Sequence, residues 1–568
     1  MASILSDRLP SDNGIEGKPW TARRKSIYLE DMAFARSRCR LRWIAVLAAG
    51  AVLWPVPGRG AGEPSYQGYR IEQIHVIRRR IFDTSVPSEN KLVYRTINHL
   101  HVLTRERAIR DQLLFKKGDL FIPDIARETE RALRSVLRLR DVHVRPVPVG
   151  GGKVDVLIEC QDTWSTEPFI GASGSGSEKK YVVGIRERNL GGFGKDVGFI
   201  YKKEPDLITR SFSYDDPALL GTRLRLSGDY ADTAEGSSRA LIIEKPFYSS
   251  LTPFSFKTHG SYEKSDSILY ENGTETNRYD QEDRELGAGF VVSLGSTVRR
   301  VRRLGLDYRF MHHRITATKS PSGTIQDDVY HPVGPTLYWQ KVSFITEDHI
   351  RLFLREEDFN VGPTLDATVG FSQSHWVKGA ANATFVKGQY SQGRLWAPGQ
   401  FGLATLKEES RYENGWKNAR TRLDLEYYKR EGTWCTWAGH MAWDQVVNPD
   451  EATQLVLGGG SGLRGYPMNE FSGNRLFVAN IENRLFFVNE VFHFFGVGGA
   501  GFVDTGYAWP EGTAPGLGDI RADYGFGVRI HFTRASLGQV LRMDVAWPTR
   551  STDGHRSPVY TFGTGQVF

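Results

Sequence analysis

The chain has 568 residues, of which 24% are charged, 40% are hydrophobic and 60 are glycine. This apolar content is too high for a mostly disordered chain. No stretch reaches the roughly 18 uncharged apolar residues that a membrane-spanning helix requires, which excludes a bundle of transmembrane helices. The net charge of +7 comes mainly from residues 1–62, whose ten Lys and Arg and five Asp and Glu leave +2 for the remaining chain, so we expect no nucleic-acid partner.

The N-terminal segment has the pattern of an export signal. Four arginines between residues 36 and 42 precede an apolar run at residues 43–54, and small residues follow at 60–62. The run is too short to span a membrane, so residues 1–62 are predicted to be a signal peptide with an extended N-terminal region. A buried helix of a soluble domain is the alternative.

The three cysteines do not indicate a chemical site. Cys39 lies in the predicted signal, and Cys160 and Cys435 are far apart in the sequence. Two widely separated cysteines make neither a disulfide framework nor a metal cluster. We therefore expect no metal and no cofactor.

Residues 68–163 combine strand-like and helix-like patterns. After a strand near 69–77, apolar residues recur at helical spacing in 104–114 and again after Pro123, and two alternating strands follow. This order predicts one small α+β domain with the arrangement β-α-α-β-β.

From about residue 167 to residue 568, apolar residues alternate with polar residues or glycine in one segment after another. Examples are residues 286–294, 304–310, 423–427 and 524–532. Alternation alone also fits a soluble β-sandwich with one dry face. The export signal, the glycines and paired charges of the polar face, and the long strands with charged connections favour a membrane barrel instead.

The length of 167–568 sets the expected strand number. At roughly 25 residues per strand and connection, it predicts a 16-stranded antiparallel transmembrane β-barrel, and 14 or 18 strands fit nearly as well. A final alternating segment that contains Phe562 and Phe568 closes the chain.

Four short motifs follow one another along the predicted barrel. They are Asn189 with Gly192 and Gly194 in residues 187–194, Asp216-Pro217, the tip Leu463-Arg464-Gly465-Tyr466, and Asp544 with Pro548 in residues 542–548. In this order, and with the terminal Phe568, they resemble the BamA/TamA-type bacterial surface antigens. Members of that family are outer-membrane barrels that insert or translocate other proteins and are preceded by POTRA domains.

The resemblance implies roles for several parts of the chain. Residues 68–163 would be one POTRA module in the periplasm, and Phe562 and Phe568 would belong to a C-terminal barrel signal. Arg464 would sit on a loop folded back into the lumen. One module is fewer than the several of the general assembly factors, so the resemblance leaves open whether this chain has their essential role.

A physical argument identifies partners for Arg464. Alternation turns Glu482 and Asp504 toward the inside of the predicted barrel. A guanidinium offers five donors in a planar fork, and a carboxylate can accept two of them, so either acid could hold the loop. The alternative is that these charges fill a wide lumen by pairing with one another.

Protein insertion or translocation needs a free strand edge and a weak point in the wall. The strand with Val142, Val144 and Pro146 is predicted to be an edge to which a client strand adds, and a proline-protected edge fits equally well. We expect the wall to be weakest where residues 169–175 meet residues 559–568, because glycines leave little side-chain packing there. Glycine-rich turns are the alternative.

The sequence therefore predicts an outer-membrane protein assembly, insertion or translocation factor that templates strands at a barrel seam. Its expected partners are the lipid bilayer of the outer membrane, unfolded outer-membrane or secreted clients, and periplasmic or lipoprotein accessory factors. The alternative is a passive outer-membrane pore or a structural surface antigen without a client. We do not expect an enzyme, since neither a Gly-x-Ser-x-Gly elbow nor a His-Glu-x-x-His helix occurs.

Overall fold

The computed structural model describes the chain from residue 66 to its end except at short gaps. The described ranges are 66–175, 178–203, 208–233, 236–318, 323–513, 515–536, 540–550 and 557–568. All of them belong to the second of two compact units, Ser65–Phe568. The predicted signal peptide lies outside the described residues.

The first elements form a three-stranded sheet with helices, which we call the small domain (residues 66–163). Its order is β1 (Arg70–Arg79), α1 (Leu92–Leu100), α2 (Glu106–Gln112), α3 (Pro123–Val136), β2 (Arg140–Gly150) and β3 (Lys153–Gln161), with a short 3-10 helix (Pro87–Glu89) before α1. The central strand β3 is parallel to β1 and antiparallel to β2. Alternate side chains of β3, such as Val154 and Val156, share one buried core with Leu133 of α3.

The small domain has one helix more than the two predicted, because α1 precedes α2 and α3. In α1 the buried residues are Tyr94 and Asn98, whereas Leu92, Val93 and Leu100 are exposed. Only Tyr94 and Ile97 of its apolar residues pack against Ile81 and Phe82, and the other three face away from the domain. The apolar spacing of this helix is therefore not that of a helix with one apolar face turned to a core.

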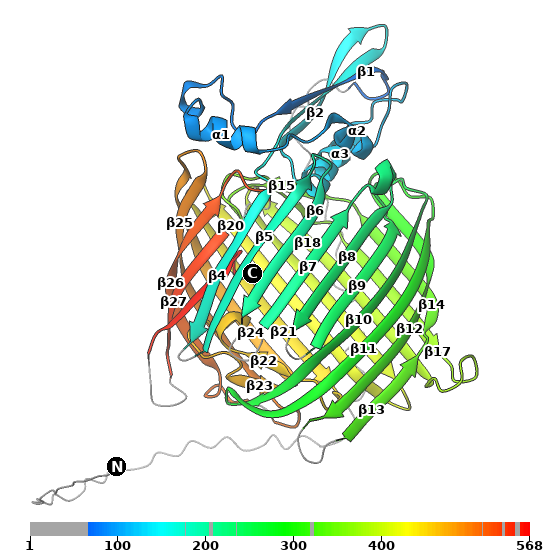
Figure 1. Cartoon of the computed structure of the whole chain (residues 1–568), viewed down its shortest axis with the longest axis vertical. Helices are drawn as coiled ribbons and strands as arrows, with labels where there is room; N and C mark the ends of the chain where they lie inside the picture. The colour runs from blue at the N-terminus through cyan, green and yellow to red at the C-terminus, as the bar shows by residue number, and fades with distance from the viewer. Residues whose placement is uncertain are drawn as a thin grey trace, which may run out of the picture. The chain divides into compact units, whose positions relative to one another are not determined.

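The remaining long strands close into a ring in which successive strands pair antiparallel and β28 lies next to β4 (Figure 1). The ring contains β4 (Thr166–Ser175), β5 (Glu178–Leu190), β6 (Lys195–Lys203), β7 (Ile208–Asp216), β8 (Arg225–Thr233), β9 (Gly236–Lys245), β10 (Phe254–Glu271), β11 (Thr274–Ser293), β12 (Arg300–Ala317), β13 (Gly323–Tyr330), β14 (Val333–Lys341), β17 (Thr364–Ser372), β18 (Ala383–Ala397), β19 (Gln400–Tyr412), β20 (Trp416–Glu431), β21 (Cys435–Val447), β24 (Arg475–Val491), β25 (Phe495–Trp509), β26 (Arg521–Phe532), β27 (Val540–Pro548) and β28 (Val559–Thr564).

The predicted number of 16 strands is too low. β13 and β14 pair with the two halves of β12 and occupy one position, so the 21 strand segments of the described ring fill 20 positions. Several hairpins turn within a few residues, as at Asn272 and Gly273 between β10 and β11. Each strand with its connection therefore uses less chain than expected.

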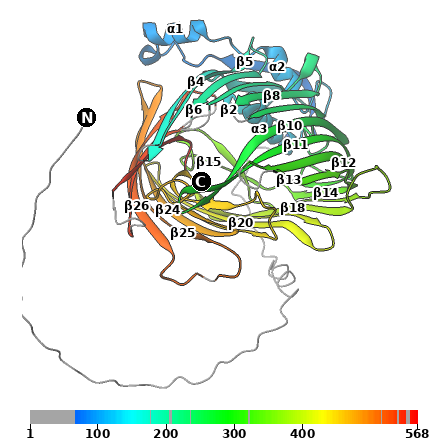
Figure 2. The same ribbon diagram turned by 60° about the horizontal axis from the view of Figure 1, so that its bottom comes forward.

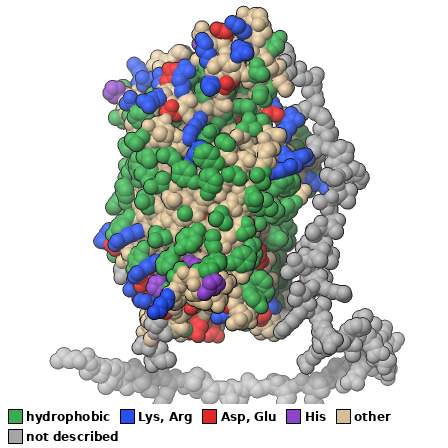
Figure 3. Space-filling model, turned by 90° about the vertical axis from the view of Figure 1, so that its right-hand side faces the viewer, with side chains coloured by type: hydrophobic (Ala, Val, Ile, Leu, Met, Phe, Trp, Pro, Cys, Tyr) green, Lys and Arg blue, Asp and Glu red, His purple; other side chains and the backbone are tan. Residues whose placement is uncertain are grey.

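Exposure along β26 shows how the barrel meets its surroundings. Tyr524, Phe526 and Val528 are exposed, while Arg529 and His531 are buried. A charged inside with an apolar outside is the inverse of a soluble protein and is the arrangement of a transmembrane β-barrel. Figure 3 shows apolar side chains gathered over the middle of the barrel wall, with Lys and Arg mostly toward its two ends. No helix among the described residues is long and apolar enough to cross a membrane.

Two connections carry short hairpins of their own. At the end of the barrel that bears the small domain, residues 342–363 form the lumen hairpin with β15 (Phe344–Glu347) and β16 (Glu357–Asn360); Figure 2 shows β15 inside the ring. At the opposite end, residues 448–474 form the lumen loop with β22 (Leu455–Leu457) and β23 (Phe471–Gly473) (Figure 1).

Candidate functional site in the barrel lumen

Apolar side chains hold the lumen loop inside the barrel. Leu463 and Tyr466 are fully buried in a cluster that includes Ala442 of β21 and Val478 of β24. Gly465 lies against the wall, where a Cβ atom would come within 2.5 Å of the Cβ atom of Asp523. The tip of the loop therefore requires glycine at position 465 to reach β26.

Arg464 directs its whole guanidinium group at carboxylates of the wall. Its Nε and Nη2 donate to the two oxygens of Asp504 at 2.7 and 2.8 Å, and Nη1 donates to Glu482 at 2.9 Å. Nη1 also lies 3.4 Å from Asp544. The side chain is 1% exposed, and its guanidinium carbon lies 3.3 Å from the centroid of the Phe502 ring. Bidentate pairing, a second acid and an aromatic face together fix the orientation of the fork.

Two further arginines hold the same carboxylates. Arg484 Nε donates to Glu482 at 3.0 Å, and Arg529 donates to Asp544. These side chains are buried on β24, β26 and β27. In such a buried cluster, removal of one partner leaves an uncompensated charge and costs about 3–5 kcal/mol, so the lumen loop is firmly anchored. We call Arg464, Glu482, Arg484, Asp504, Arg529 and Asp544 the lumen cluster.

Sequence analysis missed part of the lumen cluster. It named Asp544 only as a motif residue, and it assigned no role to Arg484 or Arg529. A signal was available, because strict alternation in β26 and β27 places Arg529 and Asp544 on the inner face. The motif residue Pro548 lies beside the loop tip, with its backbone nitrogen 3.1 Å from the position of a Cβ atom on Gly465.

The lumen hairpin enters the barrel from the other end and reaches the same cluster. Its residues Ile350 and Phe353 are fully buried, and Phe353 stacks on His531 with ring centroids 5.2 Å apart. Arg484 Nη1 donates to the carbonyl oxygen of Ile350 at 2.9 Å. Arg484 thus contacts both the hairpin and Glu482, the partner of Arg464. No sequence pattern indicated this hairpin.

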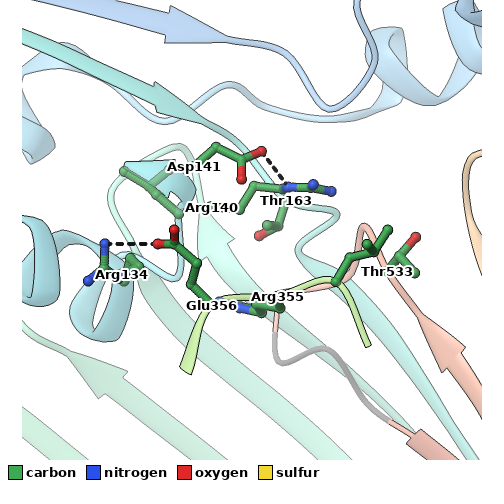
Figure 4. Close-up of a pocket in the computed structure, with 9 residues that line it drawn as sticks. Arg134, Arg140, Asp141, Thr163, Arg355, Glu356 and Thr533 are labelled. Atoms are coloured by element: carbon green, nitrogen blue, oxygen red, sulfur yellow. Dashed lines mark hydrogen bonds and ion pairs between the residues drawn. The ribbon is translucent and has the colours of Figure 1, made fainter. Parts of the chain in front are cut away.

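The lumen hairpin is also tied to the small domain. Arg134 of α3 pairs with Asp358 at 2.9 Å and with Glu356 at 3.4 Å. Arg355 donates to the carbonyl oxygen of Ala535 in the turn between β26 and β27 at 3.3 Å. Figure 4 shows Arg134, Arg355 and Glu356 at a small pocket that Thr533, which follows β26, also lines. The hairpin therefore bridges the small domain and the barrel wall.

The C-terminal residues differ from expectation. Phe562 is exposed on the outer face of β28, but the strand ends at Thr564 and Gly565 adopts a φ of 81°. The chain then turns into the lumen, where Phe568 stacks on His440 with centroids 5.3 Å apart. The expectation that Phe568 closes the last strand is therefore wrong, because the positive φ at Gly565 ends the alternation.

The motif with Asn189, Gly192 and Gly194 lies at the small domain rather than in the lumen cluster. Asn189 Nδ2 donates to Thr104 Oγ1 at 3.0 Å, and its Oδ1 accepts the Gly194 amide at 2.8 Å. A Cβ atom on Gly192 would lie 2.8 Å from the carbonyl oxygen of Leu103. The motif therefore fits the turn between β5 and β6 closely against the small domain.

The Asp216-Pro217 pair also lies outside the lumen cluster. Asp216 is buried at the end of β7, where it pairs with Lys195 at 2.9 Å. It also accepts the amide of Ala218 at 3.1 Å. These contacts shape the connection between β7 and β8, and Pro217 supplies its fixed φ there.

The predicted client-binding edge is an outer strand of the small-domain sheet. β2 lies at one edge of the order β1-β3-β2, and the side chains of Val142 and Val144 are buried. The Val144 amide donates to Glu130 of α3 at 2.7 Å. Residues two apart in a strand point their amides the same way, and the next two such positions are Pro146 and Pro148. None of these three positions can donate to an added strand, which favours the proline-protected alternative; client binding here stays a prediction.

Glu130 provides a pH-dependent test of this edge. Burial raises the pKa of Glu130 above its ordinary value. The folded small domain therefore favours the protonated carboxyl of Glu130. The stabilising contribution of this group is fully present below its ordinary pKa and is lost as the pH rises through the raised pKa. Glu130→Gln keeps an oxygen for the Val144 amide and removes the charge, so we expect it to stabilise the small domain at pH 7 and to stabilise it less at pH 4.

Amide hydrogen exchange of β2 and β3 in the full chain, in detergent, measures this effect. Glu130→Ala removes the acceptor and is expected to speed exchange at both pH values. Equal stabilisation by Glu130→Gln at pH 4 and pH 7 would contradict the role assigned to the buried charge.

The part of the chain that holds the lumen cluster matches a known family. Residues 436–568 match the model of the Omp85 superfamily domain. No curated protein sequence matches the chain. Similar solved structures include BamA from Haemophilus ducreyi lacking POTRA domains 1–3 (13% identity, TM-score 0.37, 87% of this chain and 84% of that chain), CdiB from Acinetobacter baumannii (11%, 0.41, 88% and 74%) and CdiB from Escherichia coli (11%, 0.43, 88% and 76%).

Proposed function

We propose that this chain, which carries an Omp85 superfamily domain over residues 436–568, is an outer-membrane factor that inserts or translocates other proteins and templates their strands at the seam between β28 and β4. The clients are unfolded outer-membrane or secreted proteins. The small domain is a POTRA module in the periplasm, and periplasmic or lipoprotein factors assist it.

The observation that carries the proposal is the shortness of β28. This strand has six residues, whereas its neighbour β4 has ten, and β24 and β25 have 17 and 15. At least four residues of β4 therefore have no partner on β28. Fewer ladder hydrogen bonds join the seam than join the long strands, and an extended client segment can pair with the open part of β4.

The chain end adds to the weakness of the seam. The residues after β28 are held in the lumen, where Arg484 donates to the carbonyl oxygen of Phe568 and Arg529 to the side chain of Gln566, each at 3.2 Å. While these bonds hold, β28 cannot extend along β4. The lumen cluster thus anchors the lumen loop and also keeps the chain end away from the seam.

The occupied lumen does not favour the passive-pore alternative. The lumen loop and the lumen hairpin enter from opposite ends and meet at Arg484 and Glu482. A steady, wide pore would need at least one of them to leave.

A reversible lock of the seam tests the proposal. Cysteine pairs are scanned across β4 and β28, and the pair that crosslinks fully is kept; the native Cys160 and Cys435 are buried. We expect the oxidised lock to stop insertion of a urea-unfolded eight-stranded barrel into proteoliposomes, and reduction to restore it. The matched control joins Ile481 to Val503, which lie opposite each other on β24 and β25 and are both exposed on the outer face. Undiminished insertion by the locked seam would overturn templating.

A further inference from the structure

Helix α1 is fixed to the barrel rim by its inner face. Tyr94 is buried and its hydroxyl donates to the carbonyl oxygen of Phe492, in the turn between β24 and β25, at 2.8 Å. Asn98 is buried and exchanges two hydrogen bonds with the backbone of Phe82, at 3.1 and 2.8 Å. Figures 1 and 2 both show α1 at the edge of the small domain beside the end of this hairpin. These contacts hold α1 at the rim of the barrel, beside the turn between β24 and β25.

The outer face of α1 is apolar. Leu92, Val93 and Leu100 are 77%, 55% and 66% exposed. At 100° per residue these three side chains, with Thr96 among them, occupy one arc of the helix. No contact of these side chains with another part of the described chain explains why an exposed helix carries them.

Basic residues border this apolar arc. Lys91, Arg95 and His99 are spaced four apart, so they share one side of the helix, and all three are exposed. Residues 91–100 contain no Asp or Glu. An apolar arc with a basic flank is typical of a helix that lies in the interface of a membrane, with the cationic side chains reaching the headgroups.

The apolar arc continues the lipid-facing surface of the barrel. Phe492, which Tyr94 contacts, is 74% exposed, and Phe487 and Val488 at the same end of β24 are also exposed. Phe487 and Val488 lie on β24 in the wall of a transmembrane barrel, whose outer face lipid surrounds, and Phe492 lies in the turn just beyond them. A helix attached at this point lies at the height of the headgroups rather than free in solution.

We propose that α1 is an interfacial helix that inserts Leu92, Val93 and Leu100 into the membrane leaflet at the small-domain end and binds anionic phospholipid headgroups through Lys91 and Arg95. It would hold the small domain at a fixed angle on the membrane beside β24 and β25. The inference depends on the membrane-spanning barrel and does not depend on the proposed clients.

Quenching by nitroxide-labelled lipids tests the position of α1. Leu100→Cys in the full chain carries an environment-sensitive fluorophore, and the protein is reconstituted into vesicles of phosphatidylethanolamine and phosphatidylglycerol. Val149→Cys is the matched control, because Val149 is an exposed apolar residue of the same domain at the end of β2. We expect headgroup-level nitroxide to quench position 100 at least threefold more than position 149. Equal quenching at the two positions would overturn the proposal, and Leu92→Cys repeats the measurement at the other end of the helix.

The choice of lipid tests whether Lys91 and Arg95 bind anionic headgroups. Lys91→Glu with Arg95→Glu is expected to reduce quenching at position 100 in vesicles with phosphatidylglycerol and to have a smaller effect in vesicles with phosphatidylcholine alone. Quenching that is the same with both lipids and in both charge states would overturn recognition of the anionic headgroup. If position 100 is quenched no more than position 149, and a soluble protein binds to α1, the apolar arc is a binding surface for that protein and the proposal is overturned.

Discussion

Arg464→Ala is expected to release the lumen loop and to deplete client proteins from the outer membrane. The change removes the bidentate partner of Asp504 and one partner of Glu482. Loss of one side of a buried pair costs about 3–5 kcal/mol, because Asp504 and Glu482 keep their buried charges without the Arg464 cation, and this cost favours exit of the loop tip. Limited proteolysis of the purified protein in detergent measures release of the loop, and the outer-membrane proteome of cells that carry the variant measures function.

Two variants make this test specific. Arg475→Ala is the matched control, because Arg475 is a partly exposed residue at the start of β24 that pairs with Glu511 at 3.3 Å. Such a pair is worth at most about 1 kcal/mol, so neither measurement should change. Arg464→Lys keeps the charge without the planar fork and is expected to restore only part of the resistance to protease. A loop that stays resistant in Arg464→Ala would contradict its anchoring by the lumen cluster.

Shortening the lumen hairpin is expected to raise the ion conductance of the barrel several-fold. Glu347 and Glu357 face each other at the ends of β15 and β16, so an Asn-Gly turn can replace residues 348–356 and preserve the hairpin. The change removes Ile350 and Phe353, which are buried inside the barrel. Planar-bilayer recordings of the purified protein measure the conductance.

The control for the hairpin is a loop at the opposite end. Residues 374–379, between β17 and β18, are all exposed, and replacing them with the same Asn-Gly turn should leave the conductance unchanged. If the shortened hairpin conducts no better than the unaltered chain, the hairpin does not obstruct the path of ions, and the argument against a passive pore loses this support.

The alternation of apolar and polar residues predicted best those features that depend on one strand alone. Alternation over residues 167–568, together with the export signal and the charged, glycine-rich polar face, predicted an antiparallel barrel, and alternation alone placed Glu482 and Asp504 on its inner face, where both are buried. It could not yield the number of strands, because that number depends on how tightly each hairpin turns. An average length per strand predicted 16, and the tight turns of this chain allow 20 positions.

By itself, therefore, the sequence determined which side chains of each strand face inward, because successive residues of a strand point to opposite sides whatever lies beside them. Only the tertiary structure decided which of these side chains meet. Strand register and loop path bring Asp544 and Arg464 together, and a positive φ at Gly565 turns Phe568 inward. Helix α1 was not predicted, because its exposed apolar residues Leu92, Val93 and Leu100 do not form an apolar face turned to a core.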